Sequence, residues 1–158
     1  MPVVLAASVD EALIRSSAGR HEASWRAGIE GGWRSPGPLA VVAEVDVSHR
    51  AERSALLDLQ STEGRLAVLV EGHLGPAAEP FRFVVGAGPG AALVWTHLNA
   101  YSAISPLVGG RLELGGDATL RPTAPRRSDG WTVGFRVGGF ASERGVDVDL
   151  GVRTGWVF

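Results

Sequence analysis

The last thirteen residues, Val146 to Phe158 (VDVDLGVRTGWVF), alternate between two kinds of side chain. The even-numbered positions are apolar or threonine, and the odd-numbered positions are charged residues or glycine, except Val157. Successive side chains of an extended strand point to opposite faces, so the stretch predicts one strand with an apolar face and a charged face. It is longer than the usual strand of about 5–6 residues and is long enough for the roughly 9–11 tilted residues that cross a bilayer.

The composition limits the classes of protein to consider. The chain has 158 residues, enough for one domain over 1–158, and it has no cysteine, which excludes disulfides and thiolate ligands. A net charge of −2 gives no electrostatic basis for binding nucleic acid. A transmembrane helix is excluded because no run of about 18 apolar residues is present, but a membrane-spanning barrel needs only alternation.

Six further segments show the same period of two and are predicted as strands. They span residues 23–34, 39–48, 65–74, 81–98, 111–121 and 131–139. Residues 81–98 keep one register throughout, which favours a single long strand. Two short strands that turn at Gly88-Pro89-Gly90 are the alternative.

The first twenty residues allow two interpretations, a short first strand or an N-terminal segment followed by a loop. Pro2 to Ala7 fits a short strand, whereas Ser8 with Glu11 forms a capping box that favours a helical turn over residues 9–17. Met1 to Ala7 lacks the regions of a secretion signal, so we expect an exported protein to be represented here in its mature form. With the short strand included, eight sequential strands predict an antiparallel up-and-down barrel.

The polar faces of these strands carry arginines and carboxylates in similar numbers. Paired opposite charges suit an enclosed space, which favours a barrel with a charge-filled lumen and an apolar outer surface. Glycine recurs on the same faces, for example at Gly28, Gly86 and Gly151, where a narrow interior has little room for side chains. The predicted lumen network is Arg26, Glu30, Arg34, Glu44, Asp46, Glu71, Arg82, Arg111, Glu113, Arg136, Asp147, Asp149 and Arg153, and Arg65, Asp117 and Arg121 occupy the same faces.

Large aromatic residues lie near the predicted strand ends. Trp25 and Trp33 share one face eight residues apart, which is about 26 Å along a strand and roughly 20 Å along the axis of a tilted strand. This distance is close to the spacing of the two aromatic girdles of a membrane barrel, although ordinary core aromatics are the alternative. The predicted lipid-interface aromatics are Trp25, Trp33, Phe81, Trp95, Trp131, Trp156 and Phe158.

The connections are predicted to differ between the two ends of the barrel, because outer loops are generally longer than inner turns. Turns at 35–38, 75–80 and 122–129 are expected at the periplasmic end. Connections at 9–20, 50–63, 99–106 and 142–145 are expected at the outer end, and one amphipathic turn is expected within residues 51–59.

From about residue 21 to 158, this pattern and the terminal strand ending in Phe158 resemble the small bacterial outer-membrane β-barrels of the OmpA transmembrane domain and OmpX group. The resemblance implies an all-β, antiparallel up-and-down transmembrane β-barrel of about eight strands, located in the bacterial outer membrane. It implies membrane lipids as partners, either lipopolysaccharide or phospholipid, and outer loops that offer a protein partner a place to dock. It implies no nucleic acid and no cofactor.

Few residues suggest catalysis. His73 shares a face with Glu71, which favours a structural hydrogen bond, and His97 lies near Tyr101 and Ser102 without a matching enzyme motif. No catalytic, cofactor-binding or metal-binding residue is therefore predicted. We expect a closed lumen and a structural, adhesion or partner-docking role through the outer loops. The alternatives are a soluble lipocalin-like barrel that binds a small apolar ligand and a barrel enzyme, a hydrolase or acyltransferase, that acts on lipid.

Overall fold

The computed structural model describes residues 3–15, 21–35, 37–53, 58–75, 80–120 and 130–157. These residues form eight strands: β1 (Val3–Arg15), β2 (His21–Arg34), β3 (Leu39–Arg53), β4 (Asp58–Leu74), β5 (Phe81–Leu98), β6 (Tyr101–Thr119), β7 (Gly130–Ser142) and β8 (Gly145–Val157). None of the described residues forms a helix long and apolar enough to span a membrane.

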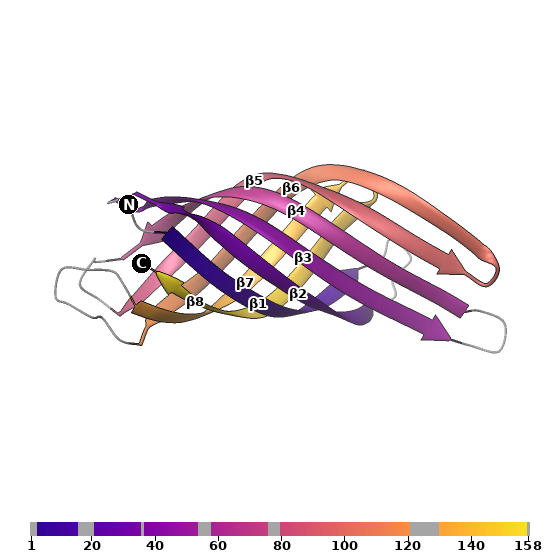
Figure 1. The fold of residues 1–158 in the computed structure, drawn as a ribbon, viewed down its shortest axis with the longest axis horizontal. Helices are drawn as coiled ribbons and strands as arrows, with labels where there is room; N and C mark the ends of the chain where they lie inside the picture. Colours follow the sequence, from indigo (N-terminus) through magenta and orange to yellow (C-terminus); the bar gives the residue numbers. More distant parts are fainter. Residues whose placement is uncertain are drawn as a thin grey trace.

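Each strand pairs antiparallel with the next, and β8 pairs with β1 to close the barrel (Figure 1). The predicted fold class, an up-and-down antiparallel barrel of eight strands, is confirmed. Because the number of strands is even, both chain ends lie at the same end of the barrel, which we call the termini end (Figure 1). We call the opposite end the far end.

The strands are staggered as they go round the barrel. A row of paired residues that starts at Arg34 in β2 crosses every strand and returns to β2 at Ser24, ten residues closer to the far end. Such a shear tilts the strands relative to the barrel axis. Residues at one height on different strands are therefore not partners in the ladder.

The alternation predicted from the sequence gives the barrel its two faces. In the final strand, Val148, Leu150 and Val152 point outward and are exposed, whereas Asp149 and Arg153 point inward and are buried. The side chains of β2 to β7 that the structure describes follow the same rule. The interior of the barrel thus holds the charges, together with buried apolar residues such as Val42, Leu69 and Val84, and the exterior is the apolar face.

The interpretation of residues 9–17 as a helical turn is wrong, and so is the loop at 9–20 as far as residue 15. Strand β1 extends to Arg15 and pairs with β2 along its whole length and with β8 along most of it. Two ladders of backbone hydrogen bonds outweigh the local capping preference of Ser8 and Glu11, which amounts to about 1 kcal/mol. Residues 16–20 lie outside the described part of the chain.

Two other expected loops are mostly strand. Strand β3 continues to Arg53 and β4 begins at Asp58, so the loop at 50–63 is wrong and so is the turn within 51–59, apart from residues 54–57, which are not described. Strand β6 begins at Tyr101, so the loop at 99–106 is reduced to Asn99 and Ala100, with Asn99 in the left-handed region at φ 53°. Strand β5 is a single strand, as predicted.

Candidate functional site

A carboxylate from β8 holds the centre of the charge network in the lumen. Asp149 is 1% exposed, and its Oδ2 accepts hydrogen bonds from Arg26 Nη1 at 2.5 Å and Arg111 Nη1 at 3.0 Å. Arg65 Nη1 lies 3.8 Å from the same oxygen. The three arginines come from β2, β4 and β6, so one carboxylate connects strands from around the whole barrel.

These arginines have further carboxylate partners. Asp46 Oδ1 lies 3.1 Å from Arg26 Nε, and Glu44 Oε2 lies 2.7 Å from Arg111 Nε. Arg65 donates through Nη2 to Glu63 at 2.6 Å and to Asp147 at 3.2 Å. A buried charge is tolerated when it is paired and hydrogen-bonded, and each of these arginines forms ion pairs with at least two carboxylates and donates a hydrogen bond to at least one of them.

A second group of charges lies nearer the termini end. Arg153 forms ion pairs with Glu30 and with Glu71, the latter at 3.4 Å. His73 Nε2 lies 3.1 Å from Glu71 Oε2. A third pair, between Arg136 and Asp117, is bidentate, with N–O distances of 2.8 and 3.0 Å.

The structure places all the predicted lumen residues on the inner face of the barrel. All thirteen point into the barrel; Arg82 and Asp147 are half-buried and the other eleven are buried. The structure gathers most of them into the ion pairs above, but Arg34 forms no ion pair or hydrogen bond with any residue that the structure describes. Arg65 and Asp117 join the network from faces where they were expected, and Arg121 lies outside the described residues.

Some members of the lumen lie outside the predicted strands, among them Glu63, Leu107 and Phe140. Glu63 was assigned to a loop, although it continues the inward alternation of β4. Phe140, 1% exposed, lies one residue beyond the predicted strand 131–139 and packs in the lumen with Ala92, Val94 and Leu107. Continuing the period of two past the predicted strand ends would have found Glu63 and Phe140.

The apolar cluster around Phe140 fits beside the charges. The guanidinium of Arg65 lies over the Phe140 ring, 4.2 Å from its centroid, which is a cation–π geometry. A Cβ atom on Gly90 or Gly109 would approach the ring to 2.9 Å. The two glycines therefore make the room that this side chain occupies.

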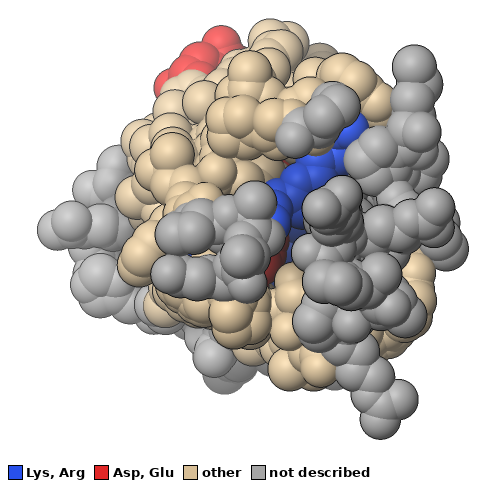
Figure 2. Space-filling model, turned by 90° about the vertical axis from the view of Figure 1, so that its left-hand side faces the viewer, with Lys and Arg blue, Asp and Glu red and all other residues tan. Residues whose placement is uncertain are grey.

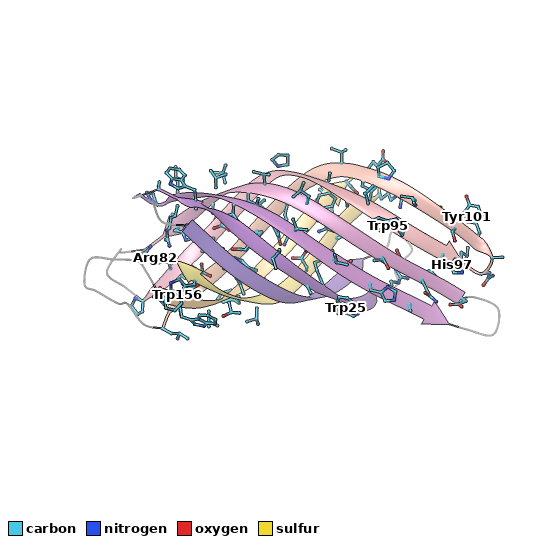
Figure 3. The ribbon with its side chains drawn as sticks, in the orientation of Figure 1. Trp25, Arg82, Trp95, His97, Tyr101 and Trp156 are labelled. Carbon is cyan, nitrogen blue, oxygen red and sulfur yellow. The ribbon has the colours of Figure 1, made fainter. Side chains whose placement is uncertain are left out.

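The predicted interface aromatics point away from the lumen. Trp25, Trp33, Trp95 and Trp131 are all more than 40% exposed, and Phe81 and Trp156 are only slightly less so. In Figure 3, Trp156 lies near the termini end, and Trp25 and Trp95 lie toward the far end. Trp131 and Trp156 are ladder partners with ring centroids 6.1 Å apart. Phe158 lies outside the described residues.

His49 and His97 form local hydrogen bonds. His97 Nδ1 lies 2.8 Å from Ser102 Oγ on the exposed β5–β6 hairpin, and His49 Nδ1 lies 2.9 Å from Thr62 Oγ1. No described carboxylate forms an ion pair with His97, so the pair lacks the third group that orients a catalytic histidine. Within the described ranges, no group of three or more potential ligands could hold a metal ion.

The fold is similar to that of several solved structures. Neisserial surface protein A aligns over 99% of this chain and 97% of its own, with a TM-score of 0.73 and 13% identity. Ail, the attachment invasion locus protein of Yersinia pestis, aligns over 99% and 98%, with a TM-score of 0.74 and 9% identity. The outer membrane protein OprG from Pseudomonas aeruginosa aligns over 99% and 95%, with a TM-score of 0.64 and 12% identity.

At these identities the similarity concerns the fold. No protein-family model matches the sequence, and no curated protein matches it. The alignments nevertheless span nearly the whole of each chain, and the strand order found here is a closed ring of eight. The chain therefore has the fold of the small outer-membrane β-barrels, the OmpA/OmpX-like type.

Proposed function

We propose that the chain is an integral outer-membrane barrel with a closed lumen, which acts as a structural, adhesion or partner-docking protein through its far end. The observation that carries this proposal is the opposite character of the two faces of β2 to β8, wherever the structure describes their side chains. Large apolar side chains such as Ile29, Phe83 and Val152 are 59–67% exposed, while the charges between them are buried. Apolar patches of this extent on a monomer mark an interaction surface, and a surface that encircles the barrel suits lipid.

The same observation disfavours the lipocalin-like alternative. A soluble barrel that binds an apolar ligand needs an apolar interior, whereas this lumen contains Arg26, Arg65 and Asp149 at 1–2% exposure. An eight-stranded barrel has an interior just wide enough for its side chains. Ion pairs that cross this interior, together with Phe140 and its neighbours, support a lumen without a conducting pore.

The far end is the part of the barrel suited to contact with other molecules. Strands β3 to β6 project beyond the rest of the barrel there (Figure 1). Residues 101–108 of β6 extend beyond its ladder with β7, which begins at Gly109, and they carry the exposed residues Tyr101, Ile104 and Val108. We propose that this end faces the cell exterior and that the termini end faces the periplasm. The partners are membrane lipids around the wall and a protein at the projecting strands.

The proposal is tested by three measurements on the purified chain. We expect it to need detergent for solubility and to migrate differently on SDS gels before and after boiling, because a folded membrane barrel resists the detergent. In planar bilayers we expect almost no stepwise conductance. A protein that purifies as a monomer without detergent would disprove the membrane assignment, and steady conductance from the folded barrel would disprove the closed lumen.

A further inference from the structure

One buried arginine stands apart from the charge network. Arg34 is the last residue of β2 and is 8% exposed. Its Nη2 atom is buried and has no hydrogen-bond partner. Among the described residues, none forms an ion pair or hydrogen bond with Arg34, whereas the other buried lumen arginines each pair with a carboxylate: Arg26, Arg65, Arg111, Arg136 and Arg153.

Charges of both signs act on Arg34. Arg82, Asp117 and Glu71 are the groups that act on it electrostatically, and Arg82 carries the same sign. The two carboxylates already accept from other cations. Glu71 contacts Arg153 and His73, and Asp117 holds Arg136 through both of its oxygens.

The stagger of the strands explains why two arginines meet here. The row of paired residues from Arg34 reaches β5 at Gly86. One full circuit of eight steps shifts the row by ten residues toward the far end. The three steps from β2 to β5 therefore shift it by about four residues. The residue of β5 at the height of Arg34 is therefore Arg82, four positions closer to the termini end than Gly86.

This pair of arginines is reached from the termini end. Arg82 is half-buried and lies near that end of the barrel (Figure 3). Figure 2 looks into the same end and shows basic side chains, which in this chain are all arginines, together with part of an acidic side chain at the bottom of the opening. A small anion from the solvent or from a lipid headgroup thus has a way to the site.

We propose that Arg34 and Arg82 form a binding site for a phosphate-type oxyanion in the mouth of the lumen at the termini end. A buried guanidinium without an ion-pair partner is unfavourable, no described residue forms an ion pair with Arg34, and an anion at this place would supply that partner. Guanidinium groups match the oxygens of phosphate in a bidentate manner, and two of them suit a doubly charged or diester group. The source is either free phosphate or the phosphodiester of a phospholipid. The site goes beyond the proposed function, which needs no ligand.

The test is a titration of the folded barrel in dodecyl maltoside, a detergent without phosphate. Inorganic phosphate is added, and arginine side-chain NMR signals and calorimetry report binding. We expect one saturable site, with an affinity that falls about tenfold or more in Arg34→Gln, because a charge-assisted hydrogen bond contributes about 1.5–3 kcal/mol. Arg34→Lys keeps the charge and should fall between the two. Arg144→Gln, an exposed arginine in the β7–β8 turn, should bind like the unchanged protein.

A second arm separates the two sources of phosphate. The barrel is placed in nanodiscs of phosphatidylglycerol and, for comparison, in dodecyl maltoside. If the lipid phosphate fills the site, the arginine signals are already shifted in the nanodiscs, and added inorganic phosphate changes nothing there. If free phosphate is the ligand, it still binds in the nanodiscs.

The proposal is overturned if neither phosphate nor phosphatidylglycerol shifts these signals, or if Arg34→Gln responds like the unchanged protein. Should Arg34→Gln fail to fold, Arg82→Gln takes its place with the same expectation. Heat-modifiability on gels reports folding independently. A barrel that folds but binds no phosphate therefore contradicts this site and leaves the proposed function intact.

Discussion

The outer wall and the lumen are built from neighbouring residues of the same strands, yet they obey different rules. On the wall, residues such as Ile29, Val45 and Leu66 need only be apolar, because lipid or another apolar medium accepts any of them. In the lumen, Asp149 must meet Arg26 and Arg111 from strands far away in the sequence. The wall therefore tolerates exchange of residues, and the lumen depends on particular pairs.

The largest expected effect tests the lumen at its centre. Asp149→Asn removes the charge that three arginines share and leaves them under-compensated, so we expect the free energy of unfolding to fall by about 3–5 kcal/mol. The measurement is urea unfolding in lipid vesicles, followed by tryptophan fluorescence. Asp147→Asn is the matched control: its carboxylate, 30% exposed, contacts Arg65, and its loss should cost less than about 1 kcal/mol. Equal losses in the two variants would contradict a network centred on Asp149.

The next effect tests the wall. Ile29 lies on the outer face of β2, halfway between Trp25 and Trp33, and is 67% exposed. Ile29→Arg places a charge at mid-height of the wall and should lower the stability in vesicles by about 2–4 kcal/mol. Glu143→Arg, in the exposed turn at the far end, provides the same side chain outside the wall and should be nearly neutral. A similar response to both substitutions would mean that the wall does not face lipid.

The smallest expected effect concerns the interface aromatics, because two of them form a specific contact on the wall. Trp131 and Trp156 lie side by side, and a double-mutant cycle with alanine should give a coupling free energy of about 0.5–1.5 kcal/mol. The same cycle on Trp25 and Trp131, which lie near opposite ends, should give a value near zero. Strong coupling in the second cycle would show that the unfolding measurement reports something other than direct contact.

The faces of the strands could be predicted from sequence because they depend on a local property. The period of two survives from β2 to β8, and each residue carries its own side-chain polarity wherever the strand pairs. Residues Val146 to Trp156 illustrate this, since their predicted and observed faces agree. The closed ring follows from the same pattern, because short connections join neighbouring antiparallel strands.

The ends of the strands and the partners in the lumen could not be predicted in this way. Strand β1 and the far halves of β3 and β4 contain residues with turn or helix preferences, and pairing with neighbours overrides those preferences. The register between strands decides that Arg26 meets Asp149, 123 positions away, while Arg34 forms no ion pair with any carboxylate that the structure describes. No single segment of the sequence contains that register.

The ten-residue climb of the strand pairing has a consequence for how the barrel can assemble. A slip of β8 by an even number of residues would keep every apolar side chain on the wall, so lipid contact alone does not distinguish the registers. A slip of four residues, however, would bring Arg153 to the place of Asp149, among Arg26, Arg65 and Arg111. Four arginines would then face one another in a closed space. The order of charges along β8 thus disfavours an alignment that the wall alone would accept, because that alignment would bring like charges together in the lumen.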